Sequence, residues 1–238
     1  MQTVTIGPND AGQRVDKFLQ KNYQNLPVSM MYKAIRQKDI KLNGRRCQIS
    51  DRLREGDVLT LYVRDEFLEK TPPVYDFLSA SRRLDIVYED ANLLLLDKKA
   101  GLLVHPDAGE YGDTLIGRVQ RYLYEKGEYD PEREQAFAPA LVNRIDRNTS
   151  GIVIAAKNAE ALRLLNDKLR NREIHKYYLC IVHGLPEPRE ATLEGYLEKN
   201  EEQNRVYILK KAKTGARTIA THYRVLEERD GLSLLEVE

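Results

Sequence analysis

The sequence predicts an α+β protein: a small N-terminal α/β domain, then a larger domain with helices and a mixed, largely antiparallel sheet. Helical apolar spacing and short strand-like runs are interspersed along the 238 residues. The dipeptides Asn43-Gly44 and Asp230-Gly231 stand between strand-like runs, which favours hairpins over parallel βαβ units. A polar, proline-containing stretch separates the parts, so we place the domains at 1–65 and 84–238 with a linker at 66–83.

The small domain begins with a predicted helix in "QRVDKFLQKNY", where Val15, Phe18 and Leu19 share one face. A second helix is expected through "SMMYKAIRQKD", with Ser29 as its N-cap. The segments "IKLNG" and "GDVLTLYV" are typical of short strands, the first ending in a turn. The domain should therefore pack two helices against a small sheet.

The larger domain opens with two strand-like runs, "LDIVYED" and "NLLLLDK". A helix is predicted through "GDTLIGRVQRYLYEKG", capped by Asp113 and ended by Gly127. Another is predicted through "KNAEALRLLNDKLRNRE", with Asn158 as its cap. The stretches "KYYLCIVHG" and "TIATHYRVLEERDGLSLLEVE" predict a strand and a hairpin.

Composition narrows the class of protein. The apolar content is 42% and the charged content 32%, and there is no apolar run of membrane-spanning length and no basic segment followed by an apolar core after Met1. Cys47 and Cys180 lie far apart and form no metal or disulfide pattern, which fits a reducing compartment. We expect a cytoplasmic, monomeric protein that is not associated with a membrane and holds no metal.

The net charge of +1 hides an asymmetry between the two parts of the chain. Residues 1–65 hold 12 Lys or Arg and 7 Asp or Glu, a net charge of +5, and the remainder carries −4. This favours a nucleic-acid-binding N-terminal domain, although ordinary surface variation gives a similar excess. The basic residues that cluster around the second helix and the following turn are Arg14, Lys17, Lys33, Arg36, Lys38, Lys41, Arg45 and Arg46.

A dense polar turn, Asn143–Gly151, interrupts two strand-like runs. The run "IVIAA" that follows is continuous, which predicts a strand buried on both faces, with the turn close to the core. Asp146 lies between Arg144 and Arg147, so we expect a partly buried, paired and ionised carboxylate, suited to a nucleophile or a base. A purely structural turn explains the same residues, because structural ion pairs are also common.

The ordered pieces "RVDKFL", "IKLNG" and "EGD" resemble the S-four RNA-binding domain over about fifty residues. The resemblance implies that the basic face from the second helix to the turn grips the RNA backbone, because closely spaced cations displace counterions from phosphate. The alternative is a solvated basic surface on a small packed domain.

The stretch "NRIDRNTSG" resembles the H-R-L-D-x-x-T-S-G signature of the RluA-type pseudouridine synthases. Upstream, "VYEDANLLLLDKKAGLLVHP" resembles that family's first motif, and downstream "KYYLCIVHG" and "RTIATHYRVL" resemble its later strands. The matches span residues 84 to 226 in order. They imply the family's fold and its reaction, the isomerisation of specific uridines in structured rRNA or tRNA to pseudouridine without cofactor or metal.

Carried over by motif, Asp146 matches the essential aspartate, and Arg144 matches the signature arginine that contacts the RNA. Tyr178 matches the active-site tyrosine that stacks on the base, although without the motif a buried strand tyrosine would be the simpler interpretation. Arg217 stands loosely where a later strand has an RNA-binding lysine. Whether the aspartate attacks the anomeric carbon or removes the neighbouring sugar proton stays open.

Three departures from the family pattern keep a second hypothesis open, an RNA-binding or regulatory protein without catalysis. Asn143 replaces the signature histidine, and Lys99 replaces a proline of the first motif. The family's G-R-x-H-Q-I-R segment, whose arginine pairs with the aspartate, is expected just after residue 238. A glycosidase is disfavoured because it needs two carboxylates and only one lies in a motif.

Overall fold

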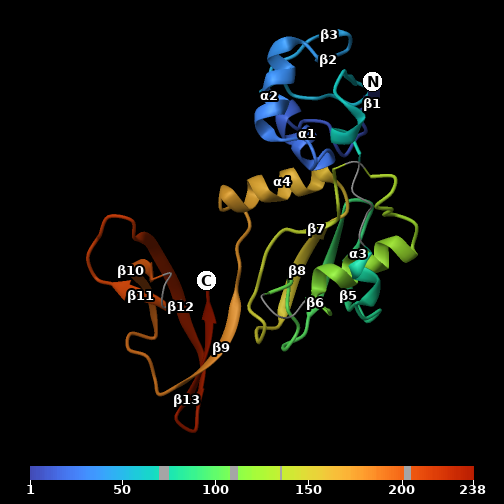
Figure 1. The fold of residues 1–238 in the computed structure, drawn as a ribbon. Coiled ribbons are helices and arrows are strands. Elements are labelled where there is room, and N and C mark those ends of the chain that lie inside the picture. The colour runs from blue at the N-terminus through green and yellow to red at the C-terminus, as the bar shows by residue number, and fades with distance from the viewer. Residues whose placement is uncertain (70–74, 108–111, 135, 201–204) are drawn as a thin grey trace. The chain divides into compact units, whose positions relative to one another are not determined.

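The structure is a computed structural model that describes residues 1–69, 75–107, 112–134, 136–200 and 205–238 (Figure 1). The chain forms two compact units, Met1–Asp167 and Lys168–Glu238. The prolines of the expected linker lie outside the described residues. Two short 3-10 helices, η1 (Asp65–Phe67) and η2 (Asp76–Ser79), lie on either side of them.

The N-terminal part of the first unit has the expected helices and a four-stranded antiparallel sheet of order β1-β4-β2-β3. Asn43 and Gly44 adopt positive φ values of 51° and 73°, which matches the tight hairpin turn predicted from this dipeptide. The elements are β1 (Gln2–Thr5), α1 (Val15–Asn22), α2 (Val28–Gln37), β2 (Ile40–Leu42), β3 (Arg45–Arg46) and β4 (Val58–Leu61).

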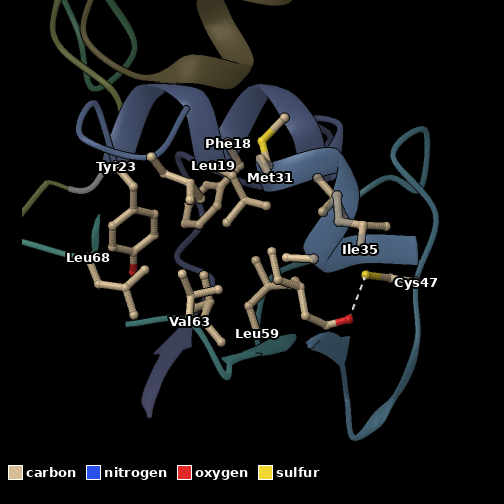
Figure 2. Packing of buried hydrophobic residues seen from close by; sticks show 14 of the residues in the cluster. Phe18, Leu19, Tyr23, Met31, Ile35, Cys47, Leu59, Val63 and Leu68 are labelled. Atoms are coloured by element: carbon tan, nitrogen blue, oxygen red, sulfur yellow. Dashed lines mark hydrogen bonds between the residues drawn. The ribbon is translucent and has the colours of Figure 1, made fainter. Parts of the chain in front are cut away.

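The core of this part lies between the helices and the sheet (Figure 2). Phe18 and Leu19 of α1 and Met31 and Ile35 of α2 are buried together with Leu59 of β4, as the helical spacing predicts. Burying apolar side chains from elements distant in sequence is what stabilises so small a domain. The basic residues of α2 and of the β2–β3 hairpin lie outside this core.

The rest of the first unit is a second antiparallel sheet of order β5-β6-β8-β7, with α3 packed against it (Figure 1). Its apolar core joins α3 to both central strands, through residues such as Val119 of α3, Leu96 of β6 and Val153 of β8. The elements are β5 (Ile86–Glu89), β6 (Leu93–Lys98), α3 (Leu115–Glu125), β7 (Ala140–Leu141) and β8 (Gly151–Ala156). The helix α4 (Ala159–Arg170) follows and includes the boundary between the units, after Asp167.

Two predicted helix caps are wrong. Ser29 lies inside α2, whose N-cap is Pro27. Thr114 rather than Asp113 caps α3, because its side chain accepts a hydrogen bond from the Gly117 amide. Asp113 is instead engaged by the Arg118 guanidinium, with N–O distances of 2.5 and 2.8 Å. The Asp113 carboxylate therefore binds a guanidinium instead of the backbone amides at the start of the helix.

Two other helix ends are as predicted. Asn158 accepts a hydrogen bond from the Ala161 amide at the start of α4. Gly127 follows Lys126, the C-cap of α3, with φ 76°, the left-handed conformation common just after a helix.

The prediction that β8 is buried on both faces is also wrong. Val153 and Ala155 are buried, but Ile152 is 48% exposed. An alternating strand with one covered face accounts for this pattern, because successive side chains point to opposite sides of a sheet.

The second unit is a five-stranded antiparallel sheet of order β11-β10-β12-β13-β9. The β12–β13 hairpin turns at Asp230 and Gly231, with φ values of 52° and 74°, as the sequence predicts. Every ladder between named strands in the described residues is antiparallel, which confirms the α+β class. The strands are β9 (Tyr178–His183), β10 (Glu190–Asn200), β11 (Arg205–Leu209), β12 (Arg217–Arg229) and β13 (Leu232–Val237).

Candidate active site

The polar turn is a loop, residues 143–150, that leads into β8, and Asn143 fastens its start to that strand. The Asn143 side-chain amide donates to the Ile152 carbonyl at 3.2 Å and accepts from the Ile154 amide at 2.8 Å. These two bonds continue the β7–β8 ladder one residue beyond its backbone pairing. An amide side chain carries the same donor and acceptor as a peptide group, so Asn143 keeps the shape of the loop without an imidazole.

The far part of the loop is joined to the turn that follows β6. The Arg147 carbonyl accepts a hydrogen bond from the Gly101 amide at 2.8 Å, and the Arg147 Nε donates to the Gly101 carbonyl at 3.1 Å. Gly101 has φ 92°, a conformation that L side chains rarely adopt. Two segments separated by more than forty residues are thereby held in register.

A buried lysine lies beneath this junction. Lys98 is only 1% exposed, and its ammonium donates to the carbonyls of Lys99, Leu102 and Arg147 at 3.1, 2.8 and 2.9 Å. Burial lowers the pKa of Lys98, and the nearby Asp146 carboxylate opposes part of that shift. One ammonium therefore holds the turn and the loop together and places a positive charge close to Asp146.

Lys98 is not among the site residues predicted from the sequence. A signal was present, because Lys98 is in phase with the inward-facing Leu94 and Leu96 of an alternating strand. Lysine is almost never fully buried, so strand periodicity alone does not outweigh that general preference.

Arg144 and Asp146 lie on the exposed side of the loop. The expectation of a partly buried Asp146 is therefore wrong for this residue. The Asp146 carbonyl accepts from the Thr149 amide at 3.1 Å, so the aspartate begins a tight turn that leaves its carboxylate outward. The Asp146 side chain is thus exposed, whereas the Lys98 ammonium that binds the same loop is buried.

His105, from the first motif, lies close enough to Arg144 to be affected by its charge. Burial lowers the pKa of His105, and the Arg144 guanidinium lowers it further. The imidazole is therefore neutral at neutral pH. This agrees with a packing role better than with that of a charged RNA ligand.

Tyr178 and Arg217 belong to the second unit, Lys168–Glu238. Tyr178 begins β9 opposite Val237, while its neighbour Tyr177 stacks on His175 with ring centroids 6.4 Å apart. Tyr177 precedes the strand, so only Tyr178 is held by the backbone ladder between β9 and β13. Arg217 is exposed at the first position of β12.

The predicted RNA-binding cations of the N-terminal domain lie at its surface, on α1, α2 and the β2–β3 hairpin. Lys41 alone among them is half-buried, and its ammonium lies 5.1 Å from the centre of the Tyr62 ring. Arg14 differs from the others because its guanidinium grips the buried Asp16 carboxylate at 3.0 and 2.8 Å. The exposed residues are Arg14, Lys17, Lys33, Arg36, Lys38, Arg45 and Arg46.

Within the described ranges, no three His, Cys, Asp or Glu side chains are grouped closely enough to hold a metal ion. The helices described there are all too short or too polar to cross a lipid bilayer.

Two protein families match the chain. The family of RNA pseudouridylate synthases matches residues 92–238, and the S4 domain matches residues 13–59. The first match spans the polar loop and Lys98 as well as Tyr178 and Arg217. The second spans α1, α2 and the basic hairpin.

Individual relatives agree with this assignment. The chain is 34% identical over 232 residues to a ribosomal large subunit pseudouridine synthase C of Vibrio cholerae, covering 96% of this chain and 69% of that protein. It is 30% identical over 239 residues to a protein of the same name from Haemophilus ducreyi, covering 99% and 71%.

A solved structure, human RNA pseudouridylate synthase domain containing 4, shares the fold with a TM-score of 0.50 at 19% identity. It covers 64% of this chain, which spans 57% of that one. The family match over most of the chain and the identity to these relatives together show that the protein belongs to the RNA pseudouridylate synthases, a family of RNA uridine isomerases, and carries an S4 domain near its N-terminus.

Proposed function

We propose that the protein converts specific uridines of ribosomal RNA to pseudouridine and that Asp146 is its catalytic carboxylate. The family supports the reaction, and the names of the bacterial relatives favour ribosomal over transfer RNA. The observation that carries the proposal is the loop itself. Hydrogen bonds from Asn143, Arg147 and the buried Lys98 hold the loop in place while Asp146 is exposed. A preorganised carboxylate reacts without first having to order its own loop.

The reaction begins when the target uridine leaves its stack and enters the site. The bond between N1 of uracil and C1′ of ribose then breaks, and the uracil turns. A bond forms between C5 and C1′, the proton on C5 is lost, and N1 gains one. No atom is added overall, so no co-substrate is required.

Asp146 acts on the ribose in this proposal, by attacking C1′ or by removing the 2′ proton. Both routes start from the ionised carboxylate. A covalent sugar–aspartate adduct trapped with a 5-fluorouridine RNA would favour attack at C1′. A primary isotope effect on release from 2′-deuterated RNA would favour proton removal.

The other motif residues are proposed in supporting roles. Arg144 contacts the RNA beside the displaced base, and Tyr178 stacks on the reacting uracil. Arg217 and the cations of the S4 domain bind phosphate. We further propose that the protein acts in the cytoplasm as a monomer, without metal or cofactor. Light scattering would test the monomeric state, and activity in the presence of a chelator would test the independence from metal.

The test is tritium release from 5-tritiated uridine in ribosomal RNA. Asp146→Asn should lower the rate by roughly 10³-fold or more, because the amide cannot replace a reacting carboxylate. Asp230→Asn is the matched control, since Asn suits the positive φ of that hairpin turn and the rate should be unchanged. Equal release by wild type and Asp146→Asn would contradict the proposal, and RNA binding without release would favour a non-catalytic RNA-binding protein.

A further inference from the structure

A hollow opens beside α2 on the basic side of the S4 domain. Its volume is about 480 Å³, within the roughly 300–1,000 Å³ typical of ligand pockets. The segment after β3 supplies the opposite wall. The lining residues are Ser29, Tyr32, Ile35, Arg36, Arg46, Cys47, Gln48 and Ile49.

The inside of the hollow is apolar. Ile35 and Cys47 are buried at its base, and the Cys47 thiol already donates to the Ile40 carbonyl at 3.4 Å. Tyr32 and Ile49 line it while remaining 36% and 39% exposed. An aromatic ring and a branched aliphatic side chain thus both line the hollow and are open to solvent, a composition that can stabilise a flat apolar ligand.

The charge of the hollow is positive. Arg36 comes from α2 and Arg46 from β3, and the lining residues include no carboxylate. Within the described part of the chain, neither guanidinium takes part in an ion pair. The site therefore combines an aromatic wall with two available cations, which is the composition of single-stranded nucleic-acid sites.

A second hollow of about 480 Å³ lies next to the first and shares Ser29 and Arg36 with it. Its lining includes Lys33 and Tyr62. Residues 29, 33 and 36 follow helical spacing, so the exposed ridge of α2 runs between two tyrosine-containing hollows. A strand crossing this ridge would meet cations on it and an aromatic side chain beyond.

We propose that the hollow at Tyr32 is a nucleobase pocket that takes one unpaired nucleotide of the RNA substrate, with the base against Tyr32 and the flanking phosphates at Arg36 and Arg46. The inference rests on RNA being the ligand of the proposed function. It adds that the S4 domain engages the face of an unstacked base as well as the backbone. A base paired within a duplex cannot enter, because its faces are covered by its neighbours.

The full chain is titrated with a fluorescent 12-nucleotide single-stranded RNA and with the same RNA in a duplex. Tyr32→Ala should weaken single-strand binding by about ten-fold, the effect of losing one base–aromatic stack, and leave duplex binding unchanged. Tyr32→Phe keeps the ring and should bind as wild type. Val28→Ala, on the same helix and outside the hollow, is the matched control.

The salt dependence of binding distinguishes the contact with the base from the contacts with the phosphates. Tyr32→Ala should leave the slope of log affinity against log salt unchanged, whereas Arg46→Gln should reduce it by about one. Unchanged single-strand binding by Tyr32→Ala would overturn the pocket and point to a protein ligand for it. Equal losses for single strand and duplex would overturn it too. Both results are independent of tritium release, so the catalytic proposal stands or falls separately.

Discussion

The two ends of the β6–β8 ladder each bury a lysine, but in opposite electrostatic settings. Lys98 lies at one end, opposite Gly151, and Lys157 follows the other end, where Leu93 pairs with Ala156. The six residue pairs of this ladder thus separate the two lysines. One lysine pairs with carboxylates, and the other binds backbone carbonyls.

Lys157 lies in a network of opposite charges. Its side chain is 7% exposed, and its ammonium contacts the carboxylates of Glu89 and Glu128 at 2.9 and 2.5 Å. Burial lowers the pKa of Lys157, but the two carboxylates more than offset this and raise it. Lys126 bonds to the same two glutamates, so two cations and two anions are balanced.

Lys98 has only backbone carbonyls as hydrogen-bond partners among the described residues. Carbonyl dipoles satisfy its three protons but do not cancel its charge, and burial lowers its pKa. The remaining positive potential lies beneath the loop that carries Asp146. At one end of the ladder the lysine is therefore neutralised by carboxylates, whereas at the other it holds the backbone of the loop that carries Asp146.

The largest effect that would test this comparison is expected from Lys98→Met. Methionine has a similar length but no donor. The carbonyls of Lys99 and Leu102 therefore lose the Lys98 hydrogen bond, and the Arg147 carbonyl keeps only the one from the Gly101 amide. The free energy of unfolding should fall by about 3 kcal/mol. The loop should also shift, and a displacement of about 1 Å can lower turnover by about 10²-fold. Urea unfolding and single-turnover tritium release on folded protein measure the two effects.

Lys99→Met is the matched control, because the exposed Lys99 pairs with Asp97 at the surface. Its effect on both measurements should be small. RNA affinity should survive in both variants, since neither removes a cation of the S4 domain. Normal turnover in a destabilised Lys98→Met would show that Lys98 serves only stability.

A smaller effect, on stability alone, is expected from Lys157→Met. Glu89 retains Lys126 and Tyr122, so the loss should be about 2 kcal/mol in the free energy of unfolding. Turnover per folded molecule should stay within about two-fold of wild type, because the partners of this network among the described residues do not include residues 143–150. A large fall in turnover would show that the two ends of the ladder are coupled.

The smallest effect is a dependence on pH that belongs to the Lys157 end. Burial raises the pKa of Glu89, but bonds from Lys126, Lys157 and Tyr122 outweigh it and lower the pKa from 4.5 to about 2. A depressed carboxylate pKa stabilises the fold above the unfolded value, so this contribution is full above about pH 4.5 and is lost as pH falls toward 2.

The stability difference between wild type and Glu89→Gln should therefore narrow as the pH falls through that window. Chemical unfolding at pH 6, 4.5 and 3.5 measures it. Glu66→Gln, at an exposed glutamate, should show little difference at any of these values. If the difference in unfolding free energy between wild type and Glu89→Gln stays constant with pH, the ionisation of Glu89 does not contribute to stability.

The sequence by itself determined the fold class, the helices and the hairpins. Apolar spacing places α1 and α2, and Asn43-Gly44 and Asp230-Gly231 can adopt the positive φ values that tight hairpins require. These are local properties, decided by neighbouring side chains and backbone sterics. The ordered motifs from residue 84 onward likewise identified the family and the loop that carries Asp146.

Only the tertiary structure decided which polar residues are buried and what they contact. Lys98 reaches the Arg147 carbonyl across 49 positions, and Arg14, one of the predicted RNA cations, is bound to a buried aspartate. Asp146 is exposed although it precedes a core strand. Burial and pairing depend on segments distant in sequence, and the energy of a charge depends on all the groups around it, so no local pattern specifies them.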